Sequence, residues 1–163
     1  MRGLSLLADG ELFVVDVTLV QKVVRNITFT SIPVAPPAVV GIGSIKGRVV
    51  TFISLAELLG RKRGAQADNA VVFKSFTNGN DQMGLIMDKP GDLIDIVEDQ
   101  ILPLPLAAED EEKNCISGMA EVEGNLYRII DIDEIIKRFK DGSESIMNTS
   151  MITQGGLNGD KKI

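Results

Sequence analysis

The chain has 163 residues, of which 44% are hydrophobic and 25% are charged, as in an ordinary soluble globular protein. Its net charge of −6 argues against nucleic-acid binding, because a phosphate backbone needs a concentrated cationic face. The absence of histidine removes most Ser-His and Cys-His nucleophilic schemes and the commonest transition-metal ligand. We therefore expect no metal and no cofactor, and an enzyme would have to work with carboxylates and lysines alone.

Three features of the sequence indicate a cytoplasmic protein without direct membrane insertion. Cys115 is the single cysteine, so it has no partner for an intramolecular disulfide, which fits a reducing compartment. Residues 1–8 carry one arginine and a short apolar run, too little for a secretory signal. The longest apolar runs are far shorter than the ~20 residues that span a bilayer.

Short apolar segments rich in Val, Ile and Thr alternate with turn signals along the whole chain, which favours an all-β sandwich or barrel. In the first half we predict a strand at 12–17, a bent pair of strands at 23–32, a proline loop at 33–37, a hairpin of 39–45 and 49–53, and a helical turn at 55–59. Gly60 ends that turn. The polar segment 60–69, which contains Arg61, Lys62 and Arg63, is the predicted solvated link between the halves.

The second half is predicted in the same way. We expect a strand at 70–76, a hairpin turn at 78–81, a returning strand at 83–88, a turn at 89–92, a strand at 93–97, an extended segment at 101–106, a hairpin of 115–122 and 126–130, and a helix at 132–139. Glu109 to Glu112 are four acidic residues in a row, which repel one another, so residues 107–114 are expected to form an exposed loop. Residues 141–163 are polar and predict a largely disordered tail.

One strand–turn–strand–helix motif occurs twice. Residues 41–59 and 118–136 align so that Gly41 coincides with Gly118 and Gly47 with Gly124, and both copies close on an apolar-x-Glu-apolar-apolar pattern. The second glycine of each copy is expected to supply the positive φ that a tight hairpin needs. The repeat therefore predicts two similar subdomains.

Several of these segments resemble the CheW family. The segment 20–25 (Val-Gln-Lys-Val-Val-Arg) is similar to the family's strand-entry segment, and 32–37 to its proline-rich approach. The segment 40–50 (Val-Gly-Ile-Gly-Ser-Ile-Lys-Gly-Arg-Val-Val) resembles its Gly-x-x-Asn-Leu-Arg-Gly hairpin, and 52–55 the exit into a short helix. Residues 84–88 and 101–105 resemble later strands, so the similarity extends over residues 8–140 in the right order.

The resemblance implies a fold and a function. It implies one CheW-like domain at residues 1–140 made of two SH3-like five-stranded β-barrels with short helices. We expect subdomain one at 10–60, subdomain two at 70–131 and a closing helix at 132–139. The implied function is a non-enzymatic adaptor that couples chemotaxis receptors to a histidine kinase.

The resemblance also implies two binding surfaces, one for the cytoplasmic hairpin tip of a receptor and one for the kinase's regulatory domain. The matching receptor-contact positions are Val20, Lys22, Gly41, Ser44 and Lys46. The kinase contact is expected on the first-barrel face, at Val39, Ile42, Val50 and Phe52. The chain departs from the family pattern because Lys46 stands for its arginine, Ser44 for its asparagine and Lys22 for an acidic residue. Lysine keeps the charge of arginine but loses its planar fork.

Three other features of the sequence could indicate a chemical site. The glycines of 41–47 imitate a dinucleotide fingerprint, but their spacing is one residue too long and strand-forming residues follow. Asp131 or Asp133 is expected to cap the last helix rather than bind a metal ion, and Cys115 to be buried and inert. Two alternatives stay open: the same fold as a regulatory or docking module in a related signalling system, and a carboxylate-based enzyme. The enzyme requires two acidic groups that converge in a pocket.

Overall fold

The computed structural model describes residues 1–65, 67–74 and 82–141, which form strands and short helices. The strands are β1 (Arg2–Ala8), β2 (Glu11–Asp16), β3 (Val20–Val24), β4 (Val39–Ile45), β5 (Arg48–Ser54), β6 (Asn69–Phe73), β7 (Gln82–Met87), β8 (Lys89–Asp95), β9 (Ile101–Leu102), β10 (Ile116–Val122) and β11 (Asn125–Ile130). The helical elements are η1 (Val17–Leu19), α1 (Leu55–Leu58), η2 (Glu98–Gln100), α2 (Asp110–Cys115) and α3 (Ile132–Asp141). The turn predicted at 78–81 and the tail predicted from 141 lie outside the described residues, except for Asp141 itself, which ends α3.

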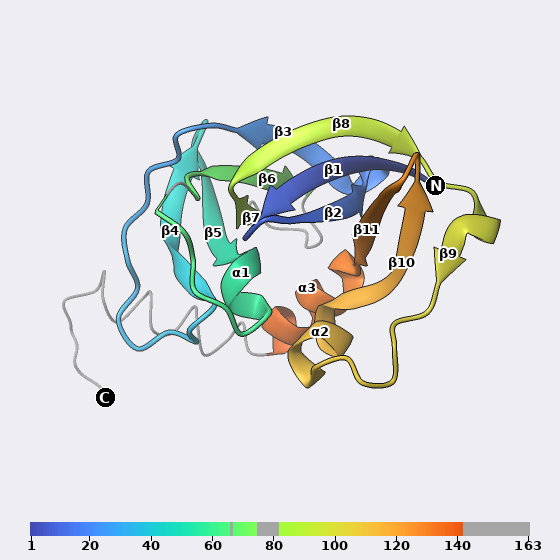
Figure 1. The fold of residues 1–163 in the computed structure, drawn as a ribbon. Coiled ribbons are helices and arrows are strands. Elements are labelled where there is room, and N and C mark those ends of the chain that lie inside the picture. Colours follow the sequence, from blue (N-terminus) through green and yellow to red (C-terminus); the bar gives the residue numbers. More distant parts are fainter. Residues whose placement is uncertain (66, 75–81, 142–163) are drawn as a thin grey trace.

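The strands form two sheets that lie side by side, with the helices at one end (Figure 1). The six-stranded sheet has the order β8-β1-β2-β11-β10-β9, and the five-stranded sheet has the order β3-β6-β7-β5-β4. The predicted all-β fold with two similar units is confirmed, and β9 adds a short sixth strand to one of them. No helix in the described part of the chain is long and apolar enough to cross a membrane.

The sheets do not follow the predicted division into residues 10–60 and 70–131. The hairpin β1–β2 belongs to the six-stranded sheet with the C-terminal strands, and the hairpin β6–β7 belongs to the five-stranded sheet with β3, β4 and β5. The chain crosses between sheets after each hairpin, first through η1 and then between β7 and β8. Each half of the chain therefore places its first hairpin in the sheet that contains the repeat of the other half, which a division by chain position misses.

The predicted repeat is confirmed at its turns. In β4–β5 the turn residues Lys46 and Gly47 have φ of 52° and 79°, and in β10–β11 Glu123 and Gly124 have φ of 50° and 81°. Positive φ at both central residues is the geometry of the two-residue hairpin turn that matches strand twist. Each hairpin also has a register shift at the same place, two residues into its first strand.

The repeat extends to the helix that follows each hairpin. The Ser54 hydroxyl accepts a hydrogen bond from the Glu57 N–H (3.2 Å) at the start of α1. The Asp131 carboxylate accepts one from the Glu134 N–H (3.1 Å) at the start of α3. Both satisfy a backbone donor that the first turn of a helix leaves free. The predicted cap by Asp131 is therefore confirmed.

A shared core joins the two sheets, and each sheet has an apolar interior of its own. Side chains alternate along β2, so that Phe13 and Val15 enter the shared core while Val14 enters the six-stranded interior. On β6, Val71 faces the shared core and Val72 the five-stranded interior. Strands buried on both faces read as continuous apolar runs. The shared core also takes in the helices through Leu55, Leu58, Cys115, Ile132 and Ile135.

Two predictions near β8 and β3 were wrong. Residues 89–92 were expected to form a turn, but they begin β8, which pairs with β1. Pro90 is tolerated there because β8 is an edge strand, where a missing N–H breaks no ladder bond. The bent pair of strands at 23–32 is also absent: β3 ends at Val24, and only Thr30 forms an isolated bridge to Ile42. β1 was not predicted at all.

The acidic segment was predicted correctly in part. Residues 110–115 form α2 rather than a loop, but Glu109, Asp110 and Glu111 are exposed, as predicted. Three of the acidic residues lie in its first turn, where negative charge interacts favourably with the helix dipole. Glu112 is half-buried and pairs with Arg128 (2.9 Å). A partner distant in sequence thus stabilises a run of like charge that is unfavourable by itself.

Candidate functional site

The β4–β5 hairpin tip presents the exposed polar residues that the sequence predicted. Ser44 and Lys46 are both exposed, the first near the end of β4 and the second in the turn. Arg48 is exposed beside them, and Val49 is 47% exposed. The tip therefore combines two cationic side chains with an accessible apolar one, an arrangement suited to a protein partner with a complementary charge at its rim.

The two predicted receptor-contact residues of β3 occupy a different place. Val20 is half-buried and packs against the shared core, opposite Phe73 of β6. Lys22 is half-buried, opposite Val72. In the five-stranded sheet β3 and β4 are the two outer strands. Val20 and Lys22 thus lie on one outer strand, β3. Ser44 and Lys46 lie at the end of the other outer strand, β4, so the four residues do not belong to a single pair of neighbouring strands.

Gly41, the fifth predicted receptor contact, is buried. A Cβ at this position would collide with the Thr30 carbonyl oxygen and lie 2.8 Å from Cδ1 of Phe29. Gly118 has the same place in the other repeat, where a Cβ would lie 2.8 Å from the carbonyl oxygen of Leu102. Both glycines let a crossing segment pass close over the hairpin. This packing explains the glycine without a contact to a partner.

Three of the four predicted kinase-contact residues are not on the surface. Val39, Val50 and Phe52 are buried, and only Ile42 is half-buried. β5 lies between β7 and β4, and Val50 and Phe52 point into the five-stranded interior. They cannot touch a partner while the fold is intact, so the prediction of a direct contact at these three positions was wrong.

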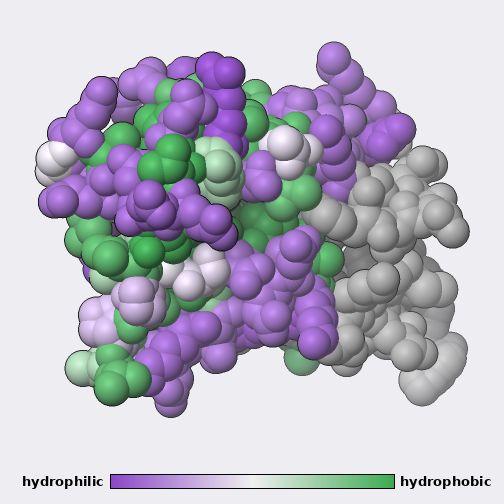
Figure 2. All heavy atoms as spheres, turned by 90° about the vertical axis from the view of Figure 1, so that its right-hand side faces the viewer, coloured by the Kyte–Doolittle hydropathy of each residue, from purple (hydrophilic) through white to green (hydrophobic). Residues whose placement is uncertain are grey.

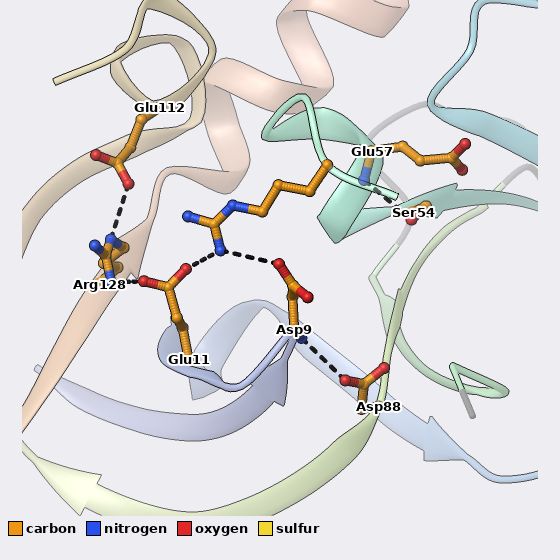
Figure 3. Close-up of polar contacts among 8 residues, drawn as sticks. Asp9, Glu11, Ser54, Glu57, Asp88, Glu112 and Arg128 are labelled. Atoms are coloured by element: carbon orange, nitrogen blue, oxygen red, sulfur yellow. Dashed lines mark hydrogen bonds and ion pairs between the residues drawn. The ribbon is translucent and has the colours of Figure 1, made fainter. Parts of the chain in front are cut away.

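A chain of ion pairs joins elements of both repeats and was missed by sequence reasoning. Glu11 on β2 binds Arg61, which follows α1, and also Arg128 on β11 (2.7 Å), which in turn binds Glu112 on α2 (Figure 3). Arg61 also pairs with Asp9 (3.4 Å). The prediction that Arg61 belongs to a solvated link was therefore wrong. No local pattern signals this contact, because 50 residues separate Glu11 from Arg61.

We expect Glu11→Gln to lower the free energy of unfolding by about 1–2 kcal/mol, since it leaves two half-buried guanidinium groups without their shared partner. The matched control is Asp95→Asn, which breaks the exposed Arg2–Asp95 pair (3.8 Å) and should change stability by less than about 0.5 kcal/mol. Urea unfolding of both variants measures the difference. Equal effects of the two substitutions would show that the ion-pair chain is no more than a surface feature.

Three of the groups that the sequence singled out for possible chemistry, Cys115, Glu112 and Asp131, are buried or already engaged. The Cys115 thiol is buried in the shared core, and this desolvation raises its pKa to about 11, while Arg138 lowers the pKa and Glu112 raises it, each to a smaller extent. The predicted burial of Cys115 is therefore confirmed. Glu112 binds Arg128 and Asp131 caps α3, so these two carboxylates do not converge. Within the described residues no group of three or more His, Cys, Asp and Glu side chains is placed to hold a metal ion.

The comparisons with known proteins cover nearly all of the described structure. The family model for the CheW-like domain matches residues 2–140. The chain belongs to the CheW-like family. The resemblance stated from the hairpin, proline and strand segments is thereby confirmed.

Curated relatives and a solved structure agree with this membership. The CheW-like chain is 26% identical over 139 residues to the chemotaxis protein CheW of Helicobacter pylori, covering 85% of this chain and 82% of that one. It is 24% identical over 123 residues to the chemotaxis protein CheW of Rhizobium meliloti, covering 76% and 79%. The crystal structure of the scaffolding protein TtCheW from Thermoanaerobacter tengcongensis superposes with a TM-score of 0.69 at 23% identity, covering 80% of this chain and 88% of that one. The structural likeness shows the fold.

The CheW-like domain also exposes apolar side chains away from the predicted contacts. Figure 2 shows the face with β9 and the N-terminus, where apolar and hydrophilic residues are mixed. The exposed large apolar residues of the six-stranded half are Met1, Leu93, Val97, Ile101, Leu102, Leu106 and Leu126. None of them was selected from the sequence, because an exposed and a buried leucine in a strand look alike there.

Proposed function

We propose that this chain is a non-enzymatic chemotaxis adaptor of the cytoplasm that holds receptors and a histidine kinase in one complex. The observation that carries the proposal is the CheW-like match over residues 2–140, with curated relatives named as chemotaxis proteins and a structural neighbour titled a scaffolding protein. An adaptor needs surfaces rather than a catalytic constellation. The paired and capping carboxylates described above suit such a scaffold.

The receptor contact is proposed at the exposed hairpin tip and along β3. Lys46 and Ser44 provide polar contacts at the tip, and Val20 and Lys22 flank the edge of the shared core. A helical receptor hairpin laid against an apolar strip gains from buried side chains, while rim charges set its orientation. Gly41 acts indirectly, because it lets the segment at Thr30 pack over β4.

The kinase contact is proposed on the outer surface of the same sheet. Ile42 is half-buried and Val49 is exposed, so both are accessible on the β4–β5 hairpin. Val39, Val50 and Phe52 support this surface from inside. Their proposed role is therefore to keep the hairpin in place rather than to touch the kinase.

We expect Lys46→Glu to weaken co-sedimentation with receptor-containing membranes and the cognate kinase by at least about tenfold, because charge reversal at a contact replaces attraction by repulsion. The matched control is Lys137→Glu, an exposed lysine on α3. Circular dichroism and thermal unfolding check that both variants are folded.

Two results would contradict the proposal at different levels. If the wild-type protein stays in the supernatant with every receptor tested, the coupling function is wrong. If the wild type enters the pellet and Lys46→Glu enters it equally well, the function stands and the hairpin-tip site is wrong.

A further inference from the structure

Four cationic side chains lie at one end of the five-stranded sheet. Lys22 is on β3, Lys74 directly follows β6, and Lys46 and Arg48 lie at the β4–β5 turn. Lys46, Arg48 and Lys74 are exposed, and Lys22 is half-buried. The chain as a whole carries a net charge of −6, so these residues, here called the cationic end, have the opposite sign to the whole chain.

The pairing of β3 with β6 places Lys22 and Lys74 together. Lys22 lies opposite Val72, two residues before Lys74. The Lys74 N–H donates to the carbonyl of Leu19 (3.0 Å), which directly precedes β3. Neighbouring strands are about 4.8 Å apart, so long side chains on both can reach the same partner.

β7 connects this pair of strands to the β4–β5 turn. Gln82 begins β7 and lies opposite Val50 of β5, two residues after Arg48. Gln82 is buried, and its amide nitrogen donates to the Phe73 carbonyl (3.1 Å) and to the side-chain oxygen of Gln21. Gln82 thus ties β3 and β6 to the start of β7, so the cationic side chains project from a backbone that is held in place.

The part of the chain that the structure describes supplies no ion pair for the cationic end. The ion pairs there involve Arg2, Arg61 and Arg128. Asp16, which precedes η1, accepts from the backbone N–H (3.0 Å) and the hydroxyl (2.8 Å) of Thr18. Like charges that form no ion pair repel one another and do not stabilise the fold. A negatively charged partner relieves this repulsion.

From these observations we propose that the cationic end binds an acidic segment of the receptor's cytoplasmic tip, with Arg48 and Lys74 as contacts in addition to Lys22 and Lys46. Lys22 stands where the family pattern has an acidic residue, so this surface carries one sign of charge where the pattern carries both. The complementary segment is therefore acidic throughout. The inference rests on the proposed function, because it takes the receptor as the partner at that site.

A local acidic segment fits this surface, whereas an extended polyanion does not. Nucleic acids and anionic membranes present negative charge over an area wider than one end of one sheet. The rest of the chain repels such a surface, because the cationic end is a small part of a protein with a net charge of −6. A protein segment can contact the cationic end alone.

The test measures, by isothermal titration calorimetry, the affinity of the full chain for the cytoplasmic fragment of a receptor that co-sediments the wild type. We expect Lys74→Glu and Arg48→Glu each to weaken binding about fivefold to tenfold at about 0.05 M salt, and by less at about 0.5 M, because salt screens exposed charges. The matched control is Lys62→Glu, an exposed lysine beyond α1 at the other end of β5, which changes the net charge equally. Its affinity should stay close to that of the wild type, and thermal unfolding checks that all variants are folded.

The outcomes separate this inference from the proposed function. Lys74→Glu and Arg48→Glu that bind like the wild type at both salt concentrations overturn the cationic end as a contact. An equal loss in Lys62→Glu shows an effect of net charge alone and overturns it as well. Binding of the wild type, but not of Lys74→Glu, to phosphatidylserine vesicles without receptor overturns the choice of partner. A wild type that binds no receptor contradicts the proposed function, and this inference with it.

Discussion

Phe52→Ala is expected to lower the free energy of unfolding by about 3–5 kcal/mol, the usual cost of truncating a buried aromatic side chain. The Phe52 ring is 1% exposed and fills the five-stranded interior beside Phe29, with ring centroids 6.1 Å apart. A Cβ at Gly43 or Gly84 would lie 2.8 or 2.9 Å from the ring, so glycine is needed at both positions to accommodate it. The cavity that Phe52→Ala leaves in the five-stranded interior cannot be filled unless the strands that carry Gly43 and Gly84 move.

Urea unfolding measures the effect, and Val49→Ala on the same strand is the control. Val49 is exposed, so its truncation should change stability by less than about 0.5 kcal/mol. The two variants also test the proposed kinase contact at Ile42 and Val49. Val49→Ala is expected to weaken kinase binding without affecting the fold. A stable, fully folded Phe52→Ala protein that no longer binds the kinase would restore the direct contact implied by the resemblance.

Gly41→Ala is expected to destabilise the protein by about 2–3 kcal/mol, because the new methyl group has no room. Besides its collision with the Thr30 carbonyl oxygen, the added Cβ would lie 2.9 Å from the Thr30 carbonyl carbon. Thr30 cannot move aside freely, since it donates to the Ile42 carbonyl (2.7 Å) and accepts from the Ile42 N–H (2.9 Å). The substitution must break these bonds or distort β4.

The control is Gly64→Ala, where the nearest atom to an added Cβ is Asp88 Oδ1 at 3.8 Å, an ordinary contact. Its stability in urea should remain close to that of the wild type. Gly41→Ala with wild-type stability but without receptor binding would mean that Gly41 touches the receptor, as the resemblance implies, and that the packing explanation is wrong.

The parts of the fold that were predicted correctly depend on neighbours in the chain. The hairpin β4–β5 follows from Lys46-Gly47, because the backbone of a two-residue turn is set by those residues themselves. The cap of α3 follows from Asp131, which needs only the N–H three residues ahead. The exposure of Lys46 follows as well, since a charged residue at a hairpin tip has no core to enter.

The parts of the candidate site that were predicted wrongly depend on the face that another element covers. Val49 and Val50 are the same residue type at adjacent positions, yet one is 47% exposed and the other 0%. A strand sends neighbouring side chains to opposite faces, and the sequence does not say which face packs. The selection of Val50 and Phe52 as surface residues failed for this reason.

By itself, the sequence determined the all-β class, the repeat with its two glycine hairpins, the cap of the last helix and the membership of the CheW-like family. Only the tertiary structure decided that the hairpins β1–β2 and β6–β7 exchange sheets, that Arg61 and Arg128 share Glu11, and that the acidic segment forms α2. Turn and cap chemistry acts over a few residues, so it can be read along the chain. The exchange follows from the need to bury both faces of strands such as β2 and β6, which is met only when segments far apart in sequence pack together.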